Sequence, residues 1–320
     1  MSPKQNLDDF LEQIKRSETE IHSLNSRAFG VGCFGVLLGA GVPIGLGVLV
    51  YNWREVPGKH EFWQIAIVAV FAAALSYFMS RPLRARAGRT HDVGSARYGE
   101  EIARPVIALL RPDFNYDPKG ALTMTSLKAS RLFNTDLCDP QPGVGFIPII
   151  SGHQIRGVVA GLPFVMHEVT ITGHGGEFQR LLTGFFQRFE LPFDVGGRLR
   201  VRSTAGDPER RPGSAGLNVV DPKVVRLVPV YEVEATGNLA TRLVTREMAT
   251  LLNSQAETEF TCHLSIDGKS AWIAIDRRRP WFEARYNSLI AAAGVEELRA
   301  TFDFTDAMAK AIQTAWVDQT

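Results

Sequence analysis

The sequence predicts a membrane protein with a two-helix transmembrane hairpin and a cytoplasmic α+β domain that contains a mainly antiparallel sheet. Two uncharged blocks predict the hairpin, and they lie between Arg27 and Arg54 and between Glu61 and Arg81. Each block is long enough for the roughly 20 helical residues that cross a bilayer. Later segments predict the sheet, because apolar and polar residues alternate in them as in strands with one buried face.

The overall composition narrows the function classes. The chain has 320 residues and a formal net charge of +1, so it lacks the basic field that would favour nucleic acid as a partner. Its three cysteines, Cys33, Cys138 and Cys262, form no CxxC pair. We therefore expect no disulfide framework and no cysteine metal site, and a reducing compartment for most of the chain.

Residues 1–27 predict an amphipathic helix. Ser2 can cap it, Pro3 fits its first turn, and Gln5 completes a capping box. Its apolar stripe consists of Leu7, Phe10, Leu11, Ile14, Ile21 and Leu24. We expect a partner helix or the protein's own soluble domain to cover this stripe. Contact with the membrane surface is the weaker alternative, because acidic residues outnumber basic ones on the other faces of the helix.

The run GVGCFG, Gly30–Gly35, has the glycine spacing of a dinucleotide-binding loop. Such a loop follows a strand and precedes an acidic residue by about 20 positions, and this run meets neither condition. We therefore predict no cofactor here. Glycines at four-residue spacing instead allow membrane helices to pack closely. The predicted packing residues are Gly35, Gly39, Gly41 and Gly45.

The predicted spans cover about residues 28–53 and 62–80, which makes 28–80 a hairpin. The short connection between them contains Pro57 and Gly58, which are typical of a tight turn. Basic residues flank the outer ends of the spans, so we expect both termini in the cytoplasm and the protein in the bacterial inner membrane. Four arginines after the second span are expected to contact lipid headgroups: Arg81, Arg84, Arg86 and Arg89.

Residues 90–320 have the composition of a soluble domain. Helices are expected at 93–110, 125–133, 239–253 and 295–316, and strands at 145–150, 154–161, 162–172, 198–203, 227–235, 259–266 and 270–276. Thr245 is a suitable N-cap, and Asp267 with Gly268 predicts a two-residue hairpin turn. The segment 203–216 is rich in proline and glycine, so it is either an exposed loop or a linker that divides the domain in two.

The segment MHEVTITGHGGEF, residues 166–178, contains the densest group of polar side chains. A zinc protease would need HExxH on a helix, but Ile171 stands at the second histidine position and the segment alternates like a strand. On a strand His167 and His174 face opposite sides, so we predict no metal site. The chain has no GxSxG nucleophile elbow. The remaining weak polar-site candidates are His153, His167 and His174.

Several blocks of the chain resemble an uncharacterised bacterial two-span inner-membrane protein family, named domain of unknown function 3137. The blocks are FNYDPKG, LLTGFFQRFELPF, VYEVEATGNLATRLVTREMATLLN, FTCHLSIDGKSAWIAI and PWFEA. The resemblance runs from the first span to about Ala284 and departs from the family at His153 and Asn238, where acidic residues are more common. It implies a β-rich cytoplasmic domain tethered to the inner membrane, and it supplies no activity, substrate or catalytic residue.

Together these observations favour an integral inner-membrane protein that binds proteins or organises a membrane complex and is not an enzyme. The expected partners are the membrane and either another protein or a second copy of the chain, held through the N-terminal helix and the spans. No nucleic acid and no cofactor are expected. The alternative is a membrane-tethered enzyme that acts on a lipid or an envelope precursor and uses His153, His167 and His174.

Overall fold

The structure, a computed structural model, shows two compact units in the chain. The first unit consists of residues 1–102 with 283–290, and the second consists of residues 103–282 with 291–320. The structure describes residues 3–36, 44, 70, 74, 76, 78, 80–82, 96–134, 149–175, 177–204, 216–258, 260–277 and 292–317.

In the first unit, helix α1 runs from Pro3 to Val36, past the predicted boundary at residue 27 and into the first predicted span. Ile14, Glu18 and Ile21 are buried along one side of this helix. Arg97, which lies in a later helical stretch, has its Nη2 atom 3.4 Å from Glu20 Oε2. The N-terminal helix therefore contacts a segment of its own chain.

The structure describes only part of the predicted hairpin. Beyond α1, the described residues within or just after the predicted spans are helical. They are residues 44, 70, 74, 76, 78 and 80–82. Among the described residues, we find no helix that combines the length and the apolarity needed to cross a membrane. The remainder of the predicted spans lies outside the described residues.

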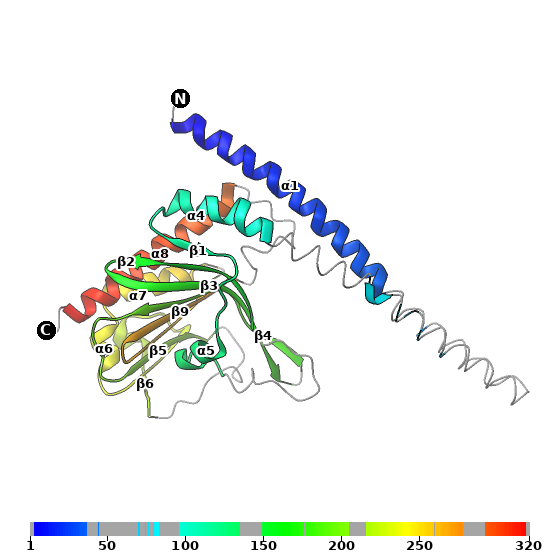
Figure 1. Cartoon of the computed structure of the whole chain (residues 1–320). Coiled ribbons are helices and arrows are strands. Elements are labelled where there is room, and N and C mark those ends of the chain that lie inside the picture. Colours follow the sequence, from blue (N-terminus) through cyan, green and yellow to red (C-terminus); the bar gives the residue numbers. More distant parts are fainter. Residues whose placement is uncertain are drawn as a thin grey trace, which may run out of the picture. The chain divides into compact units, whose positions relative to one another are not determined.

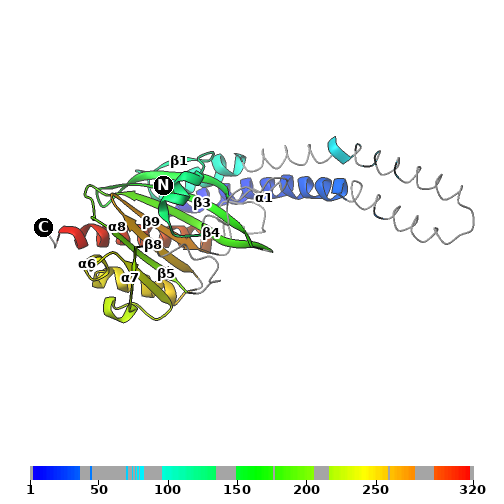
Figure 2. The ribbon, with the colours of Figure 1, turned by 90° about the horizontal axis from the view of Figure 1, so that it is seen from below.

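The second unit is built on a nine-stranded antiparallel sheet, in the order β1-β2-β3-β4-β9-β8-β5-β7-β6 (Figure 1). The strands are β1 (Asn115–Asp117), β2 (Ile149–Val159), β3 (Leu162–Gly175), β4 (Glu177–Glu190), β5 (Arg198–Ser203), β6 (Asn218–Val220), β7 (Tyr231–Ala235), β8 (Thr261–Asp267) and β9 (Ser270–Asp276). Figure 2 shows β3, β4, β9, β8 and β5 side by side. The sheet confirms the predicted α+β class with antiparallel strands.

Helices accompany both faces of this sheet. The helices of this unit are α4 (Arg104–Leu110), α5 (Met124–Ser130), η5 (Pro222–Val225), α6 (Leu239–Leu243), α7 (Arg246–Ala256) and α8 (Ala292–Val317). The π-helical turn η2 (Gly99–Ala103) precedes α4 in the chain. On one side, Thr305 of α8 donates from Oγ1 to Gln187 Oε1 of β4 at 3.2 Å. On the other side, Leu127 of α5 packs in a cluster with Phe186 and Trp272. We call these sides the α8 face and the α5 face, and successive strand residues alternate between them.

The central part of strand β4, residues 181–187, is buried on both faces. Phe185 and Phe189 lie on the α8 face and Leu182 and Phe186 on the α5 face, and none of the four is more than 1% exposed. A strand with two buried faces shows no polar alternation, so the alternation rule does not detect it. For this reason the strands expected from the sequence do not include residues 177–190.

Two local predictions need correction. The helix expected at 239–253 is divided into α6 and α7, because Val244 is not helical and Thr245 starts a new helix by accepting from Met248 N at 3.2 Å. The N-cap role of Thr245 is thereby confirmed. In the β8–β9 hairpin, Asp267 pairs with Ser270, so the two turn residues are Gly268 and Lys269 rather than Asp267 and Gly268. Gly268 begins the turn with a φ of 57°. Positive φ at the first turn residue alone is typical of a type II′ turn.

Replacement of Gly184 by alanine should destabilise the sheet. A Cβ atom at Gly184 would lie 2.1 Å from the carbonyl oxygen of Ile275 on β9. The backbone of β9 is hydrogen-bonded to β4 and cannot move away without breaking this pairing. We expect Gly184→Ala to lower the free energy of unfolding by about 2 kcal/mol or more, as overpacking does. The control is Gly152→Ala, where the nearest atom would lie at 3.6 Å. Equal melting temperatures of the two purified variants would contradict the close β4–β9 approach.

Candidate functional site

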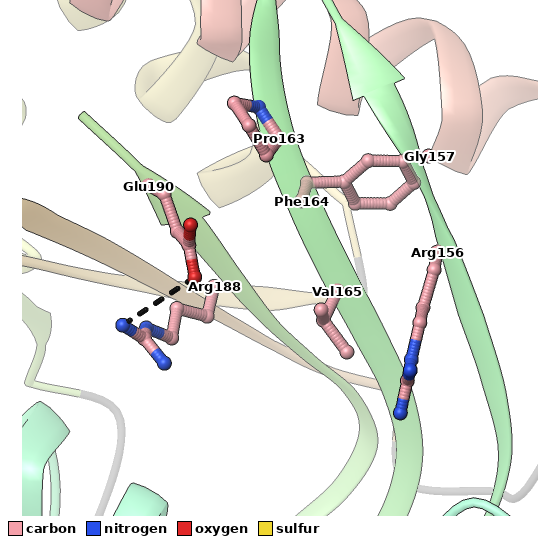
Figure 3. A pocket seen from close by; sticks show the side chains of 7 residues that line it. All are labelled: Arg156, Gly157, Pro163, Phe164, Val165, Arg188 and Glu190. Carbon is pink, nitrogen blue, oxygen red and sulfur yellow. Dashed lines mark ion pairs between the residues drawn. The ribbon is translucent and has the colours of Figure 1, made fainter. Parts of the chain in front are cut away.

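A shallow hollow of about 240 Å³ lies on the α5 face over β2, β3 and β4 (Figure 3). Its lining consists of Arg156, Gly157, Pro163, Phe164, Val165, Arg188 and Glu190. Pockets for small molecules usually enclose roughly 300–1,000 Å³. The hollow therefore has room for a small polar group with a short apolar segment, which is less than a nucleotide cofactor needs.

Two arginines dominate the charge of this hollow. Arg156, Val165 and Arg188 are directly opposed on β2, β3 and β4, so they share one face, and Figure 3 shows Val165 between the two arginines. Arg188 Nη2 lies 3.7 Å from Glu190 Oε1 and 3.4 Å from Ser270 Oγ. Arg156 is exposed and has neither a hydrogen bond nor an ion pair with any residue that the structure describes.

His153 lies in a β-bulge of β2. The β2–β3 register shifts between Gly152 and Gln154, and the φ of His153 is 55°, a value that few non-glycine residues adopt. Its Nδ1 atom shares a hydrogen bond with the hydroxyl of Tyr116. His153 is 8% exposed, and burial lowers its pKa to about 4, so the imidazole is neutral at pH 7.

His167 lies directly opposite Gln154, with their Nε2 atoms 3.1 Å apart. Burial, assisted by the positive charge of Arg156, lowers the pKa of His167 to about 4. The close packing extends to Gly120, where a Cβ atom would lie 2.3 Å from Gln154 Cβ. His167 is thus a neutral core residue on the same face as the arginine hollow, two positions from Val165 along β3.

The structure does not bring the candidate histidines together. Tyr116, the partner of His153, opposes Ile155 and therefore lies on the α8 face, whereas His167 lies on the α5 face. His174 opposes Phe178 in the β3–β4 pair, and its side chain lies outside the description. In the part of the chain that the structure describes, no three His, Cys, Asp or Glu side chains are grouped so that they could hold a metal ion.

A buried ion network on β5 and β7 is a feature that sequence analysis missed. Arg200 Nε donates to Glu234 Oε2 at 2.6 Å, and Arg202 Nη2 lies 3.1 Å from the same oxygen. Arg202 also lies 3.4 Å from Glu232. The sequence does contain one sign of this network: arginines stand at every second position of β5 and glutamates at every second position of β7. Opposite charges that face each other across a strand pair attract. Without the pairing register, these residues look solvent-facing.

The predicted membrane-contact residues lie mostly outside the described part of the chain. Gly35 is part of α1, and Arg81 is exposed in a helical stretch. The others, Gly39, Gly41, Gly45, Arg84, Arg86 and Arg89, lie outside the described residues. Helix packing and headgroup contact therefore stay predictions for all eight.

Comparison with known proteins gives one distant likeness. No family model and no curated relative matches the sequence. The chain is similar to the crystal structure of the mycobacterial trehalose monomycolate transport factor A, TtfA, with a TM-score of 0.36 and 10% identity over 65% of this chain and 97% of that one. A likeness at this level carries no argument about activity or partners. Membership of the family named above stays a prediction.

The buried histidines should make the fold sensitive to acid. Unfolded histidine has a pKa near 6.5, whereas folded His153 and His167 have pKa values of about 4. Between these values the two histidines are protonated in the unfolded chain and neutral in the folded one. Stability is complete above pH 6.5 and falls as the pH drops towards 4. We expect a loss of about 2 kcal/mol per histidine at pH 5.

Urea unfolding at pH 7 and pH 5 measures this loss. His167→Gln should lose less stability between the two pH values than the parent chain, because one titrating group is gone. An unfolding midpoint of the parent that does not change with pH would contradict the buried neutral state.

Glu234 should be essential to the ion network. Glu234→Gln leaves Arg200, 1% exposed, without its charge partner, and breaking a buried pair typically costs about 3–5 kcal/mol. Glu232→Gln is the matched control, because Glu232 is half-buried and its contact with Arg202 is longer, at 3.4 Å. We expect the control to cost less than about 1 kcal/mol. Equal melting temperatures of the two variants would refute the network.

Proposed function

We propose that this chain is an integral protein of the bacterial inner membrane whose cytoplasmic sheet domain binds other proteins or organises a membrane complex and is not an enzyme. The hairpin over residues 28–80 would anchor the chain, with both termini in the cytoplasm. Partner binding, through another protein or a second copy of the chain, would use the N-terminal helix and the spans.

The membrane part rests on large apolar side chains that are exposed at the predicted spans. They are Phe29 (75% exposed), Phe34 (58%), Ile44 (66%), Val70 (70%) and Phe78 (63%). Keeping apolar surface in water costs about 25 cal/mol per Å². Lipid as the surrounding solvent removes this cost, and the two blocks have the length that a bilayer requires.

The non-enzymatic part rests on the state of the candidate histidines. A general acid or base is most effective with a pKa near the working pH, whereas burial holds the pKa values of His153 and His167 at about 4. Each is also held in a pairwise contact, with Tyr116 and with Gln154, and the two pairs lie on opposite faces. This arrangement favours a structural role over the alternative of a membrane-tethered enzyme.

Cell fractionation tests the membrane anchor. The full chain should sediment with membranes of broken cells, resist an alkaline wash, and dissolve only in detergent. Val70→Arg, in the middle of the second predicted span, should weaken insertion, because arginine at the centre of a span costs about 2.5–3.5 kcal/mol. The matched control is Val219→Arg on β6, where the valine is also largely exposed (80%), and this variant should fractionate as the parent does. A parent chain that stays in the detergent-free supernatant would overturn the proposal.

A further inference from the structure

The hollow on the α5 face combines positive charge with an apolar floor. Two strand spacings separate Arg156 on β2 from Arg188 on β4, so their Cα atoms are about 10 Å apart. Val165 lies between them, and Pro163 and Val158 continue the apolar strip along the same face. Val158 is 56% exposed, so this strip is open to a ligand.

The charge of the hollow is unbalanced. Its lining holds two cations, Arg156 and Arg188, against one carboxylate, Glu190. Nη2 of Arg188 donates to Ser270 Oγ at 3.4 Å and lies 3.7 Å from Glu190 Oε1, so the other guanidinium nitrogens of Arg188 remain usable. His167, next to Val165 on the same face of β3, is neutral at pH 7, since its pKa is about 4, and adds no further charge.

From this geometry we infer that the hollow binds the head of a phosphate-bearing amphiphile, with the phosphate between Arg156 and Arg188 and the first part of the apolar chain on Val165, Pro163 and Val158. Guanidinium groups bind phosphate oxygens in pairs, and a phosphate monoester has enough oxygens to engage two arginines at once. A carboxylate has only two oxygens and suits one arginine. The volume of about 240 Å³ accommodates such a head but not a whole lipid.

This inference is independent of the membrane anchor, because it concerns a surface of the sheet domain and can be tested with short-chain probes in solution. Isothermal titration calorimetry on the purified full chain in neutral detergent compares three probes. Dihexanoylphosphatidic acid carries both the phosphate monoester and the apolar chains, glycerol 3-phosphate carries the head alone, and dihexanoylphosphatidylcholine has equal chains but no net charge. We expect the first to bind most tightly and its affinity to fall with added salt.

Single substitutions separate the two halves of the hollow. Arg156→Gln and Arg188→Gln should each weaken dihexanoylphosphatidic acid about tenfold or more, the loss expected for a hydrogen-bonded charge. Val165→Thr should weaken dihexanoylphosphatidic acid and leave glycerol 3-phosphate unchanged. The matched control is Arg246→Gln, which removes an exposed arginine of α7 outside the hollow. Its affinities should equal those of the parent.

The opposite results would overturn the inference. Equal weakening by Arg246→Gln would show that the probes sense only the overall charge. Equal affinity for dihexanoylphosphatidylcholine would exclude recognition of the phosphate charge, and equal affinity for glycerol 3-phosphate would exclude the apolar part of the site. Melting temperatures equal to that of the parent exclude misfolding as the cause of any loss.

Discussion

The structure of the second unit depends on the burial of β4 on both of its faces. This strand lies near the middle of the sheet, and it needs α8 on one side and the α5 cluster on the other. Gln187 at its centre is fully buried, and an amide without partners there would cost about 1–3 kcal/mol. Thr305 Oγ1 supplies one bond, and the Gln187 amide lies 3.3 Å from Met166 Sδ. The bond from Thr305 is thus a polar contact between α8 and a mainly apolar face of the sheet.

Arginines in one row of opposed residues on the α5 face differ in burial and in their charge partners. Arg156, Arg188 and Arg200 all belong to this row. Arg200 is 1% exposed and bonded to Glu234, because a buried charge requires a partner. Arg156, on the opposite side of the sheet's centre in this row, is exposed to solvent and does not require a charge partner. The same residue type is therefore structural at one end of the row and free to meet a ligand at the other.

Much of the sheet could be predicted, and the limits have physical causes. Strands with one polar face, such as β5 and β7, follow the alternation rule, and the β8–β9 hairpin carries a turn glycine. Strand β4 escapes prediction because its two buried faces remove the alternation. The split between α6 and α7 depends on one side-chain cap, that of Thr245. The periodicity of apolar residues continues through this position and therefore does not reveal the break.

The candidate site was harder to predict than the fold. His153 and His167 are recognisable as polar residues in apolar strands, but only the register and the bulge show that they belong to opposite faces. Arg156 and Arg188 lie 32 positions apart in the sequence, and they become neighbours of Val165 only through two strand pairings. The same holds for Arg200 and Glu234. Contacts of this kind are set by tertiary pairing and have no local signature.

The contact between Thr305 and Gln187 joins residues separated by 118 positions. Strand β4 is therefore made by the ribosome long before the helix that shields its α8 face. Until residues 301–312 have left the exit tunnel, Phe185, Phe189 and Met166 have no α8 to cover them. Folding of this domain is consequently complete only after α8 has emerged, and until then the nascent chain presents an apolar surface of the kind that chaperones bind.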